Sequence, residues 1–277
     1  MRTRFLVIIL LAAILSACGD AADFKKKIIN SDNGEPLILF ASATYETAVS
    51  FMSLGDLLDD GAGFCVSGDA LFVSPPAPVP EDVVQITFND CVDENGITYN
   101  GPVSMKITAF TDWQNLEYSL DLTGLKASSD WFGGEAMVSG ALDYAIAGEA
   151  GSVELTAGTF MTEVTTGQAG KLELDALSSV TELDADNPET TETSVDSAGE
   201  QSSASLDSSP LPVTLKTSSV LTEDTAADVD LLCPQSGALR LTATQDGSNA
   251  SLEYPSGTDN VYQTRTNGSF IAQYDCI

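Results

Sequence analysis

The reactive side chains of this sequence are cysteines and carboxylates, because histidine is absent. Its 277 residues include five Cys and 41 Asp or Glu but only 11 Lys or Arg, which gives a formal net charge of −30 at pH 7. Without an imidazole, Ser-His-Asp and Cys-His catalysis and His-based zinc sites are excluded. The negative charge argues against sequence-independent binding to nucleic acid, whose phosphates must be neutralised by Lys and Arg. We therefore expect no nucleic acid partner.

The strongest chemical signal is Cys18, which ends the segment Leu15-Ser16-Ala17-Cys18. Before it stand a short basic start, Met1 to Arg4, and an unbroken run of eleven apolar residues, Phe5 to Leu15. A run of this length is typical of a signal peptide, whereas a membrane-spanning helix needs about 20 apolar residues. The four residues that end in Cys18 resemble the bacterial lipobox, which the lipoprotein signal peptidase recognises.

The lipobox resemblance implies that residues 1–17 are removed and that Cys18 becomes the N-terminus, carrying diacylglycerol and an amide-linked acyl chain such as palmitate. Each buried methylene contributes about 0.8 kcal/mol, so several chains anchor a protein firmly to a bilayer. In this family an Asp directly after the Cys favours retention in the inner membrane, but Gly19 stands there. The resemblance therefore implies the outer membrane, on its periplasmic face or at the cell surface. The alternative is an ordinary secretory signal with a chance Cys.

The cysteines that remain are Cys65, Cys91, Cys233 and Cys276. An even number in an exported protein favours disulfides, and four Cys allow three pairings. In two segments a Cys stands six residues before the first Leu of a strand, and Asp-Cys ends a later strand. This imperfect repeat favours the bridges Cys65–Cys91 and Cys233–Cys276. The alternation of side chains along a strand weakens the evidence for this repeat. Cys276 shares a strand face with Phe270, whereas Cys91 falls on the face opposite Phe88 unless a bulge intervenes.

Alternating apolar and polar residues, the pattern of half-buried strands, recur along most of the chain. Val84, Ile86 and Phe88 show it, as do eight further segments: 103–109, 116–122, 138–146, 153–157, 172–176, 213–217, 239–243 and 270–276. This pattern predicts an antiparallel sheet with one solvated face. Glu94-Asn95-Gly96 predicts a hairpin between the segments on either side of it.

One segment, Glu46 to Asp59, is a convincing helix candidate, because Val49, Met52 and the Leu57-Leu58 pair can face one way. We predict an all-β fold in which a large curved antiparallel sheet forms a half-barrel or open roll. The short helix would plug one mouth of that sheet. The alternative is a β-sandwich.

The domain plan consists of a signal peptide at 1–17, a lipid-anchored tether at 18–36 and a single β domain at 37–277. Lys25, Lys26 and Lys27 in the tether either contact anionic head groups or are simply solvated. Residues 184–212 hold ten Ser or Thr and seven Asp or Glu with no basic or aromatic residue, which predicts a mobile loop. The Pro-rich residues 75–80 are expected to be an extended spacer rather than a recognition motif.

Candidates for metal or sugar binding are sparse. The stretch Asp90–Gly96 and the trio Asp184, Asp186 and Asn187 carry oxygen ligands, but neither has the calcium-loop spacing, so each is expected to be a polar turn. A glycosidase needs two carboxylates about 5 to 10 Å apart, and no segment singles out such a pair. Trp113 and Trp131 are expected to pack at sheet edges rather than stack on sugars. We therefore expect no cofactor, no metal and no catalytic residue.

Three functions remain open. The first is a non-enzymatic, lipid-anchored envelope protein with a structural or binding role toward a protein or glycan; the Cys-Pro-Gln-Ser-Gly…Asp-Cys ending is similar to that of uncharacterised Gram-negative β-rich lipoproteins. The second is a lipid or lipoprotein carrier similar to the lipoprotein-localisation proteins, whose half-barrel and helix hold an acyl chain. The third is a carbohydrate-binding protein or glycoside hydrolase. We favour the first.

Overall fold

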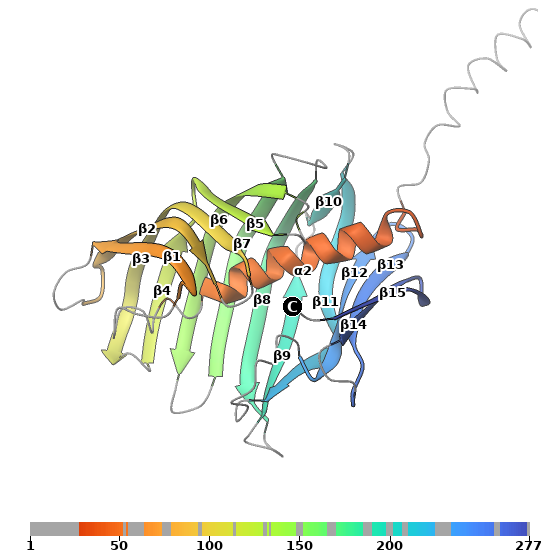
Figure 1. Ribbon diagram of the computed structural model, residues 1–277. Helices are drawn as coiled ribbons and strands as arrows, with labels where there is room; N and C mark the ends of the chain where they lie inside the picture. Colours follow the sequence, from red (N-terminus) through yellow and green to blue (C-terminus); the bar gives the residue numbers. More distant parts are fainter. Residues whose placement is uncertain are drawn as a thin grey trace, which may run out of the picture.

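The fold is known from a computed structural model, which describes most of the chain from residue 28 onward (Figure 1). The described residues are 28–51, 54, 64–73, 79–93, 96–112, 115–129, 132, 134–147, 152–164, 170–184, 190–197, 202–206, 210–224, 234–257 and 261–275. None of the helical segments among them has the length and apolar character that crossing a membrane requires.

The described residues form one long helix, α2 (Gly34–Ser50), followed by strands. The strands are β1 (Ser67–Val73), β2 (Val83–Val92), β3 (Thr98–Asp112), β4 (Asn115–Asp121), β5 (Leu125–Ser129), β6 (Gly134–Ala147), β7 (Ser152–Val164), β8 (Lys171–Leu183), β9 (Thr190–Ser197), β10 (Ser203–Ser205), β11 (Leu211–Asp224), β12 (Ser236–Ala243), β13 (Asn249–Tyr254), β14 (Val261–Thr266) and β15 (Ser269–Asp275).

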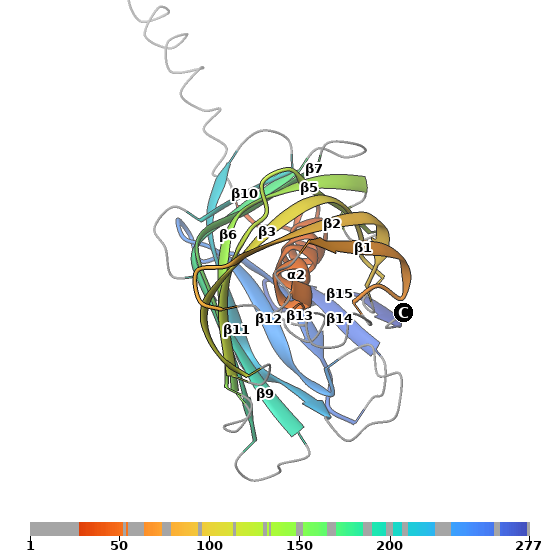
Figure 2. The same ribbon diagram turned by 90° about the vertical axis from the view of Figure 1, so that its left-hand side faces the viewer.

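All fifteen strands belong to one antiparallel sheet, and most pair with their neighbour in sequence. β5 and β9 leave this simple order, because β5 pairs with β3 and β6 while β9 pairs with β8 and β11. The sheet curves into an open roll whose edge strands are β1 and β15 (Figure 2). The prediction of a large curved antiparallel sheet is therefore confirmed, and the described strands do not divide into the two layers of a sandwich.

The expected alternation is what builds the concave face of the sheet. Val84, Ile86 and Phe88 of β2 are buried while the residues between them are exposed. The hairpin predicted at residues 94–96 joins β2 to β3, with Val92 opposite Thr98. Period-two alternation thus places one apolar row per strand toward the inside of the roll.

The helix α2 lies along this concave face and fills it (Figures 1 and 2). Helix side chains such as Leu37, Ile38 and Phe40 are almost fully buried. The helix predicted at Glu46–Asp59 starts earlier than expected: α2 covers Gly34–Ser50, Leu54 is helical as well, and residues 52, 53 and 55–59 lie outside the described residues. The reason is that a helix enclosed by a sheet is apolar or small on most sides and lacks the amphipathic stripe that the prediction required.

Hydroxyl groups from the sheet bind the C-terminal half of α2. The Tyr144 hydroxyl donates to the Ala48 carbonyl at 2.6 Å, and the Tyr118 hydroxyl donates to the Phe51 carbonyl at 2.8 Å. The last carbonyls of a helix have no partner within the helix, so these two tyrosines satisfy groups that burial would otherwise leave unpaired. The Ser50 hydroxyl adds a 2.6 Å hydrogen bond to the buried Asp93 carboxylate.

The segment before α2 is held against the other end of the sheet. The Ile29 amide donates to the Ser248 hydroxyl at 2.8 Å, and the Asn267 side-chain amide donates to the Ile29 carbonyl at 3.1 Å. The predicted tether at 18–36 is therefore too long at its C-terminal end. Its last residues, from Ile28 on, belong to the folded body, and helix α2 starts at Gly34.

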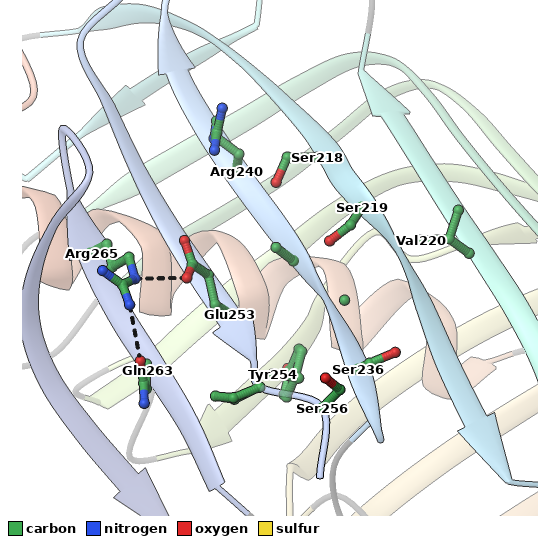
Figure 3. Close-up of a pocket in the computed structure, with 13 residues that line it drawn as sticks. Ser218, Ser219, Val220, Ser236, Arg240, Glu253, Tyr254, Ser256, Gln263 and Arg265 are labelled. Atoms are coloured by element: carbon green, nitrogen blue, oxygen red, sulfur yellow. Dashed lines mark hydrogen bonds and ion pairs between the residues drawn. The ribbon is translucent and has the colours of Figure 1, made fainter. Parts of the chain in front are cut away.

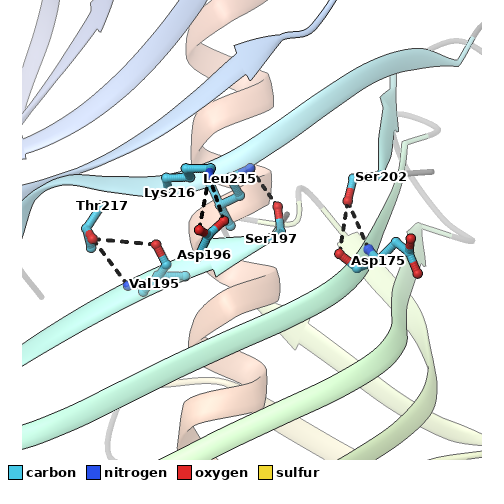
Figure 4. A network of polar contacts seen from close by, with 8 residues as sticks. All are labelled: Asp175, Val195, Asp196, Ser197, Ser202, Leu215, Lys216 and Thr217. Atoms are coloured by element: carbon cyan, nitrogen blue, oxygen red, sulfur yellow. Dashed lines mark hydrogen bonds and ion pairs between the residues drawn. The ribbon is translucent and has the colours of Figure 1, made fainter. Parts of the chain in front are cut away.

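The Ser/Thr-rich segment 184–212 was predicted to be a mobile loop, and this was wrong for much of its length, because it contains β9 and β10. Side-chain hydroxyls bind backbone groups where these short strands meet β8 and β11 (Figure 4). Ser197 accepts a 2.7 Å hydrogen bond from the Leu215 amide, and Ser202 accepts one of 2.9 Å from the Asp175 amide. Thr also has a high strand propensity, which a judgement from polarity and charge overlooks.

The bridge Cys65–Cys91 is present, with the two Cα atoms 5.2 Å apart. The bulge that this pairing required is centred on Asp90, whose φ is +47°, and the β2–β3 register shifts between Phe88 and Cys91. Cys91 is therefore buried on the same side as Phe88. Opposite the bulge, a Cβ on Gly68 would lie 1.9 Å from the Asp90 carbonyl oxygen, so only glycine fits there.

Replacing both bridged cysteines tests this pairing. We expect Cys65→Ala/Cys91→Ala to lower the free energy of unfolding by about 3 to 4 kcal/mol, because the bridge spans 26 residues of sequence. Urea unfolding of the oxidised wild type and the double variant measures the difference. A peptide map under non-reducing conditions that joins Cys65 to Cys233 or Cys276 would contradict the pairing.

Candidate functional site

Among the described residues of the β domain, one basic side chain does not take part in an ion pair. All six basic residues beyond the tether lie in described strands, and five make ion pairs with N···O distances of 2.7 to 3.1 Å: Lys106–Glu81, Lys126–Glu135, Lys171–Glu173, Lys216–Asp196 and Arg265–Glu253. The sixth, Arg240 of β12, is exposed, and no described residue forms an ion pair or hydrogen bond with its guanidinium. In a chain with 41 acidic residues, an unpaired arginine is unusual.

Strand register places Arg240 in a row with two other cations. Lys216 of β11 lies directly opposite Arg240, Ser251 of β13 lies opposite Arg240 on the other side, and Arg265 of β14 lies opposite Ser251. We call Lys216, Arg240 and Arg265 the cationic row. Like charges directly opposite each other on neighbouring strands destabilise a sheet. The Asp196 carboxylate offsets the charge of Lys216, but no carboxylate among the described residues forms an ion pair with Arg240.

A shallow pocket of about 640 Å³ opens beside the cationic row, on the face of β11–β14 that points away from α2 (Figure 3). We call it the Arg240 pocket. Four serine hydroxyls, two arginines, one glutamate, one glutamine and a few apolar groups surround it: Ser218, Ser219, Val220, Ser236, Gly237, Ala238, Arg240, Glu253, Tyr254, Pro255, Ser256, Gln263 and Arg265. Its volume lies within the usual range of small-ligand sites.

Irregular pairing of β11 shapes this pocket. The register between β11 and β12 shifts between Thr217 and Ser219 and again between Ser219 and Thr222, so the residues between them are aimed outward. Gly237 of β12 has φ +123°, and a Cβ there would lie 2.4 Å from the Val220 carbonyl oxygen. Glycine therefore lets β12 pack directly against the bulged part of β11.

One wall of the pocket is held rigid by Arg265. Its Nε donates to Glu253 at 2.7 Å, and one terminal nitrogen donates to the Gln263 side-chain oxygen at 3.3 Å (Figure 3). The Ser251 hydroxyl donates to the same Glu253 at 2.9 Å. The charges of Arg265 and Glu253 thus offset each other, and Arg240 supplies the uncompensated positive charge of the pocket.

A second group of ionisable residues lies around the helix. Burial, followed by the charges of Glu223 and Asp93, raises the pKa of Glu46 to about 8 from its ordinary 4.5. The folded state therefore favours a protonated Glu46, and its contribution to stability is lost as the pH rises from about 4.5 through about 8. Asp93 itself accepts hydrogen bonds from the Ile97 amide and the Tyr99 hydroxyl, which ties it to the β2–β3 hairpin.

The residues singled out from sequence lie elsewhere. Cys65 and Cys91 form their bridge beside β1 and β2, while Cys18, Cys233 and Cys276 lie outside the described residues. Of the calcium candidates, Asp90 exchanges two hydrogen bonds with Asn100, and the Asp184 carboxylate accepts one from the Thr190 hydroxyl. Asp186, Asn187, Trp113, Trp131 and Lys25–Lys27 lie outside the described residues. Within the described part of the chain, no three acidic or Cys side chains gather as a metal site would require.

Comparisons with protein-family models, with curated proteins and with solved structures found no match. The candidate site is therefore the Arg240 pocket, which the sequence did not reveal. The available signal was the scarcity of cations: half of the six basic residues in the β domain fall at Lys216, Arg240 and Arg265. That these three share one row depends on strand register, which no local pattern reveals.

Proposed function

We propose that this chain is a non-enzymatic, lipid-anchored protein of the bacterial envelope that binds a hydroxyl-rich ligand, a glycan, in the Arg240 pocket. The observation that carries the proposal is the gathering of serine hydroxyls and one unpaired guanidinium around an open volume of about 640 Å³. Hydroxyl groups both donate and accept hydrogen bonds, so they match the hydroxyls of a sugar. Pro255 and Val220 add the apolar contact that a sugar ring also needs.

The single carboxylate of the pocket supports binding rather than hydrolysis. Glycoside hydrolases use a pair of carboxylates on either side of the scissile bond. Among the described residues that line the Arg240 pocket, the carboxylate is that of Glu253, and Arg265 and Ser251 occupy its oxygens. A carboxylate held in this way is a poor general acid or nucleophile.

The position of the N-terminal segment supports anchoring through the strands that carry this pocket. Residue 28, where the described chain begins, follows the expected lipidated Cys18 by ten positions, a span of at most about 36 Å when fully extended. Ile29 is hydrogen-bonded to the turn after β12 and to the turn after β14. The tether would therefore hold β12–β14 by these turns, at the ends of the strands that lie away from Ser236 and Ser256 of the pocket.

The packing of α2 favours this role over that of a lipid carrier. A half-barrel carrier needs its concave face open to an acyl chain, whereas here α2 covers that face and its side chains are buried against the sheet. Releasing the helix would break the hydrogen bonds from Tyr118 and Tyr144. A ligand site on the outer face needs no such movement.

Filling the pocket tests the binding role. We expect the full chain to bind oligosaccharides on a glycan array and Ser218→Trp to lose this binding, because the indole would occupy the space beside Arg240. Thr108→Trp, at an exposed position of β3 far along the sheet, is the matched control and should bind as the wild type does. Absence of binding to every glycan by the folded wild type would overturn the proposal.

Lipid attachment is tested separately by labelling. Cells of a Gram-negative host that express the full chain are grown with radioactive palmitate. We expect the wild type to be labelled and to sediment with membranes, and Cys18→Ser to lose both properties, because Cys18 is the expected acylation site. Cys65→Ala/Cys91→Ala should keep the label. Retention of label by Cys18→Ser would disprove the anchor.

A further inference from the structure

The Arg240 pocket has a net positive charge that a neutral glycan would not neutralise. The cationic row and its two partners, Asp196 and Glu253, sum to one net positive charge, although the whole chain carries −30. At physiological ionic strength charges are screened beyond about 8 Å, so a ligand in the pocket responds to these neighbours more than to the distant acids. The site is therefore locally suited to an anion.

The unpaired guanidinium of Arg240 has the geometry to bind an oxyanion. Arginine presents parallel N–H donors that bind carboxylate or phosphate oxygens in pairs. A phosphate has more oxygens than one guanidinium fork can serve, and the hydroxyls of Ser218 and Ser219 lie in the same pocket as further donors. An anion between Lys216 and Arg240 would also relieve the repulsion of these opposed cations.

We propose that the ligand of the Arg240 pocket is a phosphorylated sugar, with its phosphate on Arg240 and its hydroxyls on the serines of β11 and β12. This inference rests on the proposed glycan-binding function and adds the charged group that the glycan carries. The phosphate belongs to a membrane glycolipid headgroup or to a soluble sugar phosphate. The headgroup is one candidate because Asn267, which holds the segment that follows the tether, stands two residues after Arg265.

Calorimetry on the full acylated chain in phosphatidylcholine nanodiscs tests this, with glucose 1-phosphate, glucuronate and methyl glucoside as probes. We expect glucose 1-phosphate to bind best. Arg240→Gln should bind it about 10- to 100-fold more weakly, the loss expected for a hydrogen bond to a charged group, while its affinity for methyl glucoside, which carries no charge, falls much less. Arg240→Lys, which keeps the charge but not the fork, should fall between the two.

Lys106→Gln is the control, because it removes an exposed cation on β3, outside the pocket, and should leave all affinities unchanged. Among the described residues Arg240 has no ion pair or hydrogen bond that Arg240→Gln would break, so we expect this variant to keep the thermal transition of the wild type. Including lipid A, a phosphorylated disaccharide lipid, in the nanodiscs identifies the source of the phosphate. Competition with glucose 1-phosphate assigns it to the headgroup, and lack of competition assigns it to a soluble sugar phosphate.

The outcomes separate this inference from the proposed function. Equal affinity for methyl glucoside and glucose 1-phosphate would overturn the phosphate assignment and leave glycan binding in place. Binding of glucuronate as tight as that of glucose 1-phosphate would also overturn it, in favour of a carboxylate. No heat from any probe, together with no binding on the glycan array, would overturn both.

Discussion

Burial of α2 against the concave face of the sheet is the interaction on which the rest of the structure depends. An open sheet of fifteen strands exposes its inner apolar rows unless something covers them, and α2 does so along the length of the roll. Each fully buried Leu, Ile or Phe side chain contributes about 1.5 to 3 kcal/mol, and Leu37, Ile38 and Phe40 of α2 are all buried in this way. The helix is thus the central part of the core.

This arrangement decides where a ligand can bind. With the inner face covered by α2, the proposed binding site lies on the outer face, where strand pairing is irregular. The bulged part of β11 against Gly237 of β12 is such a place, and the cationic row lies beside it. The segment that precedes the helix is hydrogen-bonded to the turns after β12 and β14, so the proposed lipid anchor would be tied to these strands. Helix α2 and the segment before it thus connect the core to the strands that carry the pocket.

Most strands, but neither the helix bounds nor the pocket, could be predicted from sequence. Alternation located the inward rows, as at Val84, Ile86 and Phe88, because each strand has one solvated face. The search for an apolar helix face failed for α2, because this helix is enclosed and has no single apolar face. Composition failed for β9, because Ser and Thr residues form a strand there despite their polarity. The charge on Arg240 is visible in the sequence, but its lack of a partner follows from the register of β11–β14, which is a long-range property.

The central claim, that α2 is part of the permanent core rather than a cover that opens for a ligand, is tested most directly by native-state hydrogen exchange of the full acylated chain in detergent micelles. The account predicts that amides of α2 exchange as slowly as those of β6 and β7, in a single cooperative unit, because unfolding of the helix would expose the concave face of the sheet to water. Rapid exchange of α2 while β6 and β7 stay protected would contradict the account and favour a carrier whose helix opens.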